Sequence, residues 1–139
     1  MAWRITSEFL KSRRVLIIDD DPEVRTLHRQ MLEACGALVV EAGSVGNAFE
    51  LLNRLTPHAI LSDLEMPERG GLEFIRKLRA SVLPAAHVPA ICITSLPAEQ
   101  YRARVLIAGF QAIMTKPLHR EHLCEVVRQL IDRSGATTG

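Results

Sequence analysis

The sequence predicts a single α/β domain, a doubly wound sheet of five parallel strands with helices on both faces. Five short apolar runs, rich in β-branched residues, are typical of buried strands in a parallel sheet: residues 15–18, 38–40, 59–61, 91–93 and 112–114. A segment with apolar residues at helical spacing follows each run. Right-handed crossovers between parallel strands then place helices on both faces of the sheet.

The first two helices carry recognisable start and stop signals. Asp21 is a candidate N-cap with Pro22 at the first helical position, and Gly36 is a candidate stop. Ser44 can cap the second helix, which ends before Pro57 because a residue that precedes proline disfavours helix. The expected buried faces are Val24, Leu27, Met31 and Cys35 in the first helix, and Ala48, Leu51, Leu52 and Leu55 in the second.

The remaining elements follow the same alternation. A loop containing Pro67, Gly70 and Gly71 precedes a third helix, and residues 84–89 form the connection into the fourth strand. Residues 98–108 predict a fourth helix that ends at Gly109. The expected buried residues are Leu72, Ile75 and Leu78 in the third helix, and Leu123, Val126, Val127 and Leu130 in the last.

Five polar residues sit where these strands end. Asp19, Asp20, Asp63, Thr94 and Lys116 each follow or end an apolar run, so they should converge where the carboxyl ends of the strands meet. Three carboxylates there would repel one another unless a cation joined them, and all-oxygen ligands suit Mg²⁺. A lysine and a hydroxyl beside such a cation suit a phosphoryl group.

Length and composition fit one domain. The chain has 139 residues, 47% hydrophobic and 24% charged, with a net charge of +1, so no direct nucleic-acid partner is expected. Its apolar runs fall short of the roughly 18 residues that a membrane span needs, and residues 1–11 lack the features of a signal peptide. Cys35, Cys92 and Cys124 are widely spaced, which favours packed, reduced thiols and a cytoplasmic location without membrane insertion.

The ends of the chain lie outside the strand–helix pattern. We assign residues 1–12 to an N-terminal extension, residues 13–133 to the domain and residues 134–139 to a flexible tail. In the extension, Trp3, Ile5, Phe9 and Leu10 could form an extra helix that packs on the domain or on a partner. Equally, the extension could be a flexible leader or the end of a longer parent protein. Too few residues follow 133 to form a further domain, unless the chain was cut from a longer protein.

Four segments together resemble the receiver domains of bacterial response regulators. Residues 15–24 resemble the first strand and acidic pair of that family, and residues 60–67 with Gly71 and Leu72 resemble its phosphoacceptor segment. Residues 89–95 resemble the strand that carries its switch hydroxyl, and residues 108–109 with 115–118 resemble the segment of its lysine. The similarity covers about residues 13–133, with all four motifs in the right order.

The resemblance implies a flavodoxin-like fold with strand order 2-1-3-4-5, and a role for each site residue. Asp63 would be the phosphorylated aspartate. Asp20, Asp63 and the carbonyl oxygen of Glu65 would ligate Mg²⁺, with Asp19 acting mainly through a metal-bound water. Thr94 would hydrogen-bond the phosphoryl group, and Lys116, before a cis peptide to Pro117, would pair with the aspartate or the phosphoryl group.

The resemblance also implies partners. A histidine kinase or a phosphotransfer protein would supply the phosphoryl group, and output would pass through contact with another protein. The chain would then be a signalling phosphoacceptor rather than an enzyme. One residue departs from the family: Ile113 stands where receivers usually carry Tyr or Phe, so the phosphorylation chemistry is unaffected but an aromatic switch is not available for output.

Two other functions compete with this interpretation. A pseudo-receiver would bind partners without cycling phosphate, which Ile113 favours and the intact acidic pair opposes. A haloacid-dehalogenase-type phosphohydrolase would use Asp19 and Asp21, but it leaves Asp63 unexplained and needs a later acidic pair that the sequence offers only as Glu121 and Glu125.

Several polar residues also have plainer interpretations. Asp21 is best explained as a helix cap, and Thr94 could bond only its local backbone. The pair His119 and His122 is more typical of solvated side chains than of a metal site, and His28 is expected to be exposed on the first helix.

Overall fold

The computed structural model describes residues 5–67 and 69–137, with side chains through Gly135. Five parallel strands form one sheet in the order β2-β1-β3-β4-β5, which confirms the predicted fold class and strand order. The strands are β1 (Arg14–Ile18), β2 (Leu38–Ala42), β3 (Ala59–Asp63), β4 (Ala90–Thr94) and β5 (Ala112–Thr115).

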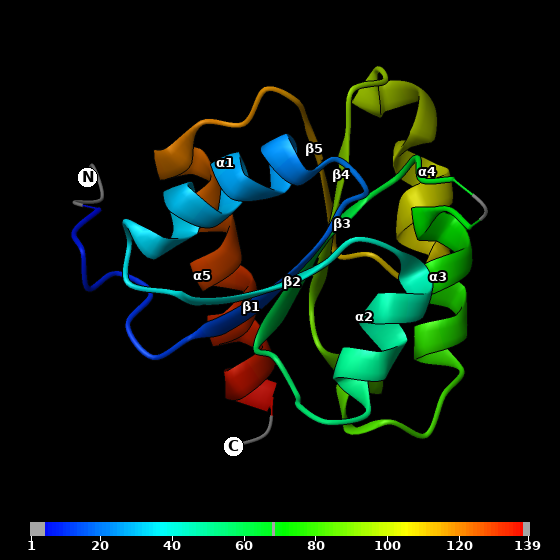
Figure 1. Cartoon of the computed structure of the whole chain (residues 1–139), viewed down its shortest axis with the longest axis horizontal. Coiled ribbons are helices and arrows are strands. Elements are labelled where there is room, and N and C mark those ends of the chain that lie inside the picture. Colours follow the sequence, from blue (N-terminus) through cyan, green and yellow to red (C-terminus); the bar gives the residue numbers. More distant parts are fainter. Residues whose placement is uncertain (1–4, 68, 138–139) are drawn as a thin grey trace.

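Helices cover both faces of the sheet (Figure 1). Helices α1 (Pro22–Glu33) and α5 (Arg120–Thr137) lie on one face, and α2 (Val45–Leu52), α3 (Gly71–Arg79) and α4 (Ala98–Ala108) lie on the other. A short 3₁₀ helix, η1 (Pro84–His87), lies in the connection to β4. Within the described residues, no helix is long and apolar enough to cross a membrane.

The two faces of the sheet have separate hydrophobic cores. Along β1, Val15 and Ile17 pack under α1 and α5, whereas Leu16 and Ile18 pack under α2 and α3. Successive residues of a strand point to opposite faces, so a strand buried on both sides is mostly apolar along its whole length. This requirement explains the uninterrupted apolar runs of the sequence.

Helix α1 begins as the sequence predicts, and Cys35 and Met31 pack in the core as expected, but the buried face is shifted toward His28 and Leu32. The side chain of Asp21 caps it by accepting hydrogen bonds from the N–H groups of Glu23 and Val24. The fully buried residues are His28 and Leu32, whereas Leu27 is 48% exposed. The prediction that His28 is exposed is therefore wrong, because a stripe drawn from apolar residues alone passes over a buried histidine.

Three boundaries differ from the sequence prediction. Helix α2 ends at Leu52, where the side chain of Asn53 donates to the Phe49 carbonyl, so Leu55 lies beyond the helix. Helix α5 continues to Thr137, although a flexible tail was placed from residue 134. Residues 7–12 form turns rather than an added helix, and Trp3 lies outside the described residues.

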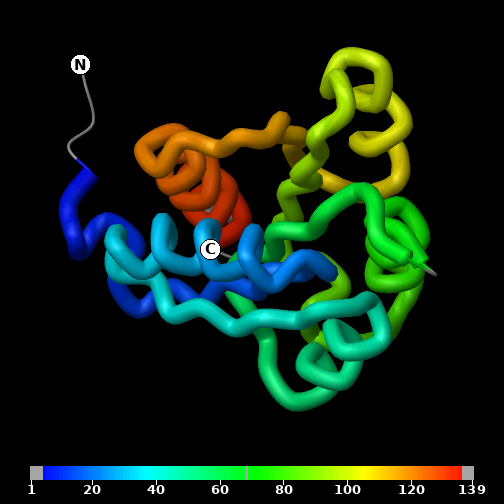
Figure 2. The backbone as a smooth tube through the Cα atoms, turned by 45° about the horizontal axis from the view of Figure 1, so that its top comes forward, coloured from blue at the N-terminus to red at the C-terminus, as the bar shows by residue number. Residues whose placement is uncertain are grey.

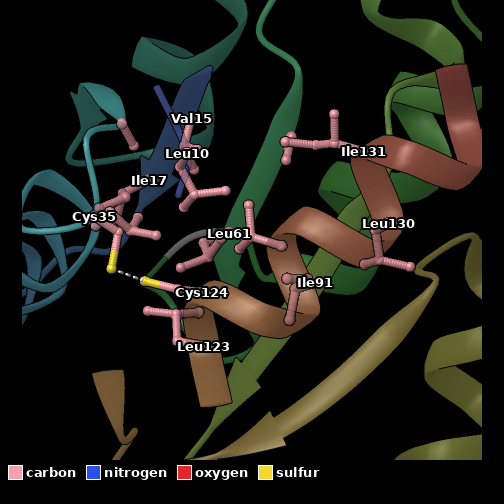
Figure 3. Close-up of a cluster of buried hydrophobic side chains, with 14 of the residues drawn as sticks. Leu10, Val15, Ile17, Cys35, Leu61, Ile91, Leu123, Cys124, Leu130 and Ile131 are labelled. Carbon is pink, nitrogen blue, oxygen red and sulfur yellow. Dashed lines mark hydrogen bonds between the residues drawn. The ribbon is translucent and has the colours of Figure 1, made fainter. Parts of the chain in front are cut away.

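The N-terminal segment packs onto the domain beside the end of α1. Leu10 is almost fully buried, and its N–H donates to the Cys35 carbonyl over 2.7 Å, so the segment lies beside the C-terminal end of α1 (Figure 2). Under it, Cys35 and Cys124 meet in the core between α1 and α5 (Figure 3). Both thiols are free and buried, with their sulfur atoms 2.7 Å apart, and burial raises the pKa of Cys124.

One arginine ties together four segments at the end of the sheet opposite the strands' carboxyl ends. The guanidinium of Arg79, at the end of α3, donates to three carbonyl oxygens and one side-chain oxygen over 2.7–3.0 Å: those of Gly109, Ala86, Val88 and Gln111. Gly109 has a φ of +131°, and a Cβ there would lie 2.8 Å from Arg79 Cγ. Arg79 therefore fixes the C-terminal end of α4 to the body of the domain.

We expect Arg79→Ala to lower the free energy of unfolding by about 2–4 kcal/mol, because it removes four hydrogen bonds and leaves the carbonyl oxygens of Ala86 and Val88 without this donor. Urea denaturation measures this loss. Arg76, an exposed residue of the same helix, is the matched control, and Arg76→Ala should cost no more than about 0.5 kcal/mol. Equal losses in the two variants would contradict a specific role for the Arg79 contacts.

Candidate functional site

The strand ends bring the predicted site residues together. In the parallel register Ile18 lies opposite Ser62, Asp63 opposite Ile93, and Thr94 opposite Thr115. Asp19 and Lys116 each lie one residue beyond these pairs. The carboxyl ends of β1, β3, β4 and β5 therefore form a single row of polar groups, as the sequence analysis expected.

Lys116 joins two of the carboxylates. Its Nζ lies 3.2 Å from Asp63 Oδ1 and 3.3 Å from Asp19 Oδ2. Both aspartate side chains are buried, and the lysine side chain is 22% exposed. Burial alone would lower the pKa of Lys116, but the charges of Asp63 and Asp19 outweigh that effect and raise it. The lysine is thus a fixed positive charge between two acids.

Asp63 is held in an environment that disfavours its charge. Burial is the main cause, and the charge of Asp19 adds to it, so the pKa of Asp63 rises from 3.8 to about 6 even though Lys116 opposes the rise. The sequence analysis expected the three carboxylates to repel one another, and repulsion by Asp19 does contribute to this rise, but desolvation is the larger cause. A cation bound to this carboxylate, or a covalent modification of it, would relieve the cost of holding a negative charge in this buried position.

Asp20 completes a cluster of three acids. One carboxylate oxygen each from Asp19, Asp20 and Asp63 lies within 4.8 Å of the others, and among the described residues this is the only group of three acids, histidines or cysteines so placed. Asp20 is exposed, in contrast to its two neighbours. An all-oxygen donor set with one open side fits Mg²⁺, which keeps several waters when it binds to protein.

Asp19 is fixed on every side. Its N–H donates to the Ala42 carbonyl over 3.1 Å, and its Oδ1 accepts from the Asp21 N–H over 2.9 Å. Its Oδ2 faces Lys116, and its carbonyl oxygen accepts from Arg25 Nη1 over 2.7 Å. Asp19 therefore connects β1, β2, α1 and Lys116, a role that its position at a strand end did not predict.

Thr94 and Glu65 have less direct places in the structure. The hydroxyl of Thr94 is fully buried and accepts a hydrogen bond from the Leu96 N–H over 3.0 Å. The carbonyl of Thr94 accepts from the Lys116 N–H over 2.8 Å, which ties β4 to the lysine. Glu65 lies two residues after Asp63 with an exposed side chain. The Lys116–Pro117 peptide is cis, as the resemblance implied.

Two residues on α1 have places near the site that the sequence analysis did not predict. Arg25 on α1 bonds both the Asp19 carbonyl and Glu41 of β2, and the imidazole of His28 is buried behind the acids. Burial, with the charge of Lys116, lowers the pKa of His28, although the charge of Asp19 opposes this effect. Glu41 stands near the end of the otherwise apolar strand β2, and this isolated charge could have indicated a basic partner such as Arg25.

Comparison with known sequences identifies relatives of this chain. Residues 15–128 match the response regulator receiver domain family. An uncharacterised 14.6 kDa protein of Leptolyngbya boryana is 40% identical over 83% of this chain and 87% of that protein. A gliding motility regulatory protein of Myxococcus xanthus is 35% identical over 88% of the chain, and there the chain spans only 15% of its relative's length.

Solved structures show the same fold. The receiver domain of a sensor histidine kinase from Pseudomonas aeruginosa, described with a magnesium ion in its active-site cleft, is 27% identical with a TM-score of 0.78, over 86% of this chain and 98% of that one. A putative response regulator from Chloroflexus aurantiacus is 22% identical with a TM-score of 0.82, over 88% and 99%. With the family match over residues 15–128, these findings establish that the chain belongs to the response regulator receiver domains of two-component signalling.

Proposed function

We propose that this receiver domain accepts a phosphoryl group on Asp63 in a magnesium-dependent reaction, and that the modification switches its contacts with another protein. The observation that carries the proposal is the placement of Lys116 between Asp63 and Asp19, beside a third carboxylate. Such a site neutralises the charges of a phosphoryl group and leaves one carboxylate to receive it.

The chemistry assigned to each side chain is an in-line displacement. A carboxylate oxygen of Asp63 attacks phosphorus, the bond from phosphorus to the donor nitrogen breaks, and the electron pair leaves with the donor imidazole. Lys116 stabilises charge on the equatorial oxygens, and Asp19 keeps the lysine in place. Bound Mg²⁺, held by Asp20, Asp63 and the Glu65 carbonyl with Asp19 acting through a water, would supply the remaining positive charge.

A relative supports the proposed class of phosphoryl donor. The chain is 31% identical to part of an autoinducer sensor kinase/phosphatase of Vibrio cholerae, spanning 17% of that protein's length. A histidine kinase or a phosphotransfer protein is therefore the proposed donor for this chain, which acts as a phosphoacceptor rather than as an enzyme. The intact acidic cluster and Lys116 favour this function over a pseudo-receiver, and the family match favours it over a phosphohydrolase.

The first test is the mass of the intact protein after incubation with Mg²⁺ and a small-molecule acyl phosphate. We expect the wild type to gain one phosphoryl group and Asp63→Asn to gain none, because the amide is not a nucleophile for this reaction. Chelation of Mg²⁺ should also abolish the gain. Asp132→Asn, at an exposed acid on α5, is the matched control and should be labelled like the wild type.

Two results would contradict the assignment. Full labelling of Asp63→Asn would move the phosphoacceptor to another residue. A wild type that binds Mg²⁺ but never gains mass from the acyl phosphate or from phosphorylated kinases would favour the pseudo-receiver instead.

The raised pKa of Asp63 also predicts how stability depends on pH. The folded state binds this proton more tightly than the unfolded chain, so the resulting stability is complete below about pH 4 and is lost as the pH rises through about 6. Without Mg²⁺, the wild type should lose roughly 3 kcal/mol relative to Asp63→Asn across that interval. Urea denaturation of both proteins at a series of pH values measures the difference.

Mg²⁺ should reverse this loss, because it binds the ionised site only in the folded state. Millimolar Mg²⁺ at neutral pH should raise the melting temperature of the wild type and barely change that of Asp20→Asn. An equal rise in both proteins would remove Asp20 from the metal site. A pH profile shared by the wild type and Asp63→Asn would show that Asp63 does not carry the raised pKa.

Output has to use a route other than an aromatic switch. Ile113 is buried on β5 and has no ring to reorient. Helix α4 is loosely held: Val105 is its fully buried residue, Ile107 is 87% exposed, and its first turn has no side-chain cap. A cleft of about 470 Å³ lies beside that turn, lined among others by Pro97, Arg102, Ile113 and His122. The N-terminal end of α4 can therefore shift while Arg79 fixes the other end.

We expect a phosphate analogue to move residues 95–105 while Ile113 keeps one rotamer. Thr94→Ala should leave Asp63 phosphorylation partly intact but abolish these shifts, because the buried hydroxyl bonds the first residues of the loop. NMR shift mapping with and without the analogue tests this. Ser95→Ala, at an exposed hydroxyl next in the chain, should behave as the wild type. Residues 95–105 that stay unmoved in the wild type would exclude this route.

A further inference from the structure

Arg25 links the acidic site to the edge strand of the sheet. Its Nη1 donates to the carbonyl oxygen of Asp19 over 2.7 Å, and its Nε donates to Glu41 Oε1 over 3.2 Å. Arg25 and Glu41 are 21% and 24% exposed, so the pair is largely shielded from solvent. Gly43 leaves room for the guanidinium, since a Cβ there would lie 3.2 Å from Nη1.

The atom that Arg25 holds determines where Asp20 points. The carbonyl of Asp19 belongs to the same rigid peptide plane as the N–H of Asp20. The N–H of Asp19 is fixed by the Ala42 carbonyl, so the bond from Arg25 secures the backbone on the far side of Asp19 as well. The direction in which Asp20 leaves the strand end follows from this plane.

Asp20 depends on this anchor more than the other two acids. Lys116 holds the carboxylates of Asp19 and Asp63, whereas within the described part of the chain no hydrogen bond or ion pair holds the Asp20 side chain. Asp20 is also exposed, so packing does not fix its rotamer. Its position is therefore set by its backbone alone.

We propose that Arg25 is a positioning residue for the divalent cation. Held against Glu41, it fixes the Asp19–Asp20 peptide and so presents the Asp20 carboxylate to the ion shared with Asp63. The inference rests on the proposed function, since it concerns the cation that phosphoryl transfer uses. Residues that orient metal ligands without touching the metal typically change affinity by about 10–100-fold when they are removed.

The chain supplies a matched control for the charge of Arg25. Arg29 lies one turn further along α1, forms an ion pair with the other oxygen of Glu41, and lies 3.6 Å from Glu33. Both arginines are positively charged, lie on α1 and pair with Glu41. They differ in that Arg25 donates to the Asp19 carbonyl. Replacing Arg29 therefore removes one positive charge and one contact with β2 but keeps the hydrogen bond from Arg25 to the Asp19 carbonyl.

The experiment is calorimetric titration of the full chain with Mg²⁺, for the wild type and the variants Arg25→Gln, Arg25→Lys and Arg29→Gln. We expect Arg25→Gln to raise the Kd about 10-fold or more and Arg29→Gln to change it less than about twofold. Arg25→Lys should also weaken binding, because one ammonium cannot serve both Glu41 and the Asp19 carbonyl as a planar fork does. Thermal unfolding in a chelator checks that each variant is folded.

A second measurement separates positioning from a general loss of structure. The phosphorylation rate with acyl phosphate is followed as a function of Mg²⁺ concentration, and Arg25→Gln should need more Mg²⁺ yet approach the wild-type rate at saturation. If Arg25→Gln does not fold, Glu41→Gln replaces it, and a raised Mg²⁺ Kd in that variant supports the anchor.

Four results would overturn the inference: an unchanged Kd in Arg25→Gln or in its replacement, equal weakening in Arg29→Gln, full retention of affinity in Arg25→Lys, or a saturating rate that stays depressed. These differ from a failure of the proposed function, in which the wild type itself neither binds Mg²⁺ nor gains a phosphoryl group.

Discussion

The balance of charge at the carboxyl ends of the strands is the constraint on which the rest of the structure depends. Three carboxylates meet one ammonium, and two of the acids and the lysine are largely withdrawn from water. Lys116 offsets part of the repulsion, but the pKa of Asp63 still rises to about 6. The carboxylates of the site are thus only partly neutralised by Lys116, which supports the proposed cation and phosphoryl group.

The scaffold around this site is built to hold charged groups still. Asp19 is bonded through its N–H, its carbonyl and both carboxylate oxygens, which joins β1 to β2, α1 and β5 at one residue. Arg79 performs a similar task at the opposite end of the sheet, where it ties α3 to the segments before β4 and β5. Helix α4 is held at its C-terminal end by Arg79 and only loosely at its N-terminal end. This difference supports the proposed movement of its N-terminal end after phosphorylation of Asp63.

The sequence by itself determined the fold class, the strand order implied by family resemblance, and the place of five predicted site residues at or just beyond the strand ends: Asp19, Asp20, Asp63, Thr94 and Lys116. It could do so because both faces of β1, β3 and β4 are buried, which favours apolar runs in these strands and places their charged residues at the ends. Asp21 and Ser44 were identified as caps for an equally local reason, since a cap bonds N–H groups two or three residues away.

Only the tertiary structure decided which face of α1 is buried, how far α2 and α5 extend, and which groups support Asp19. His28 is buried because α1 sits over the sheet and beside α5, a packing relation that apolar periodicity within one helix does not contain. Arg25 and Glu41 lie 16 residues apart on different elements, and their bond exists because β2 pairs with β1 beneath α1. The desolvation that raises the pKa of Asp63 likewise depends on everything packed around it, which no local stretch of sequence specifies.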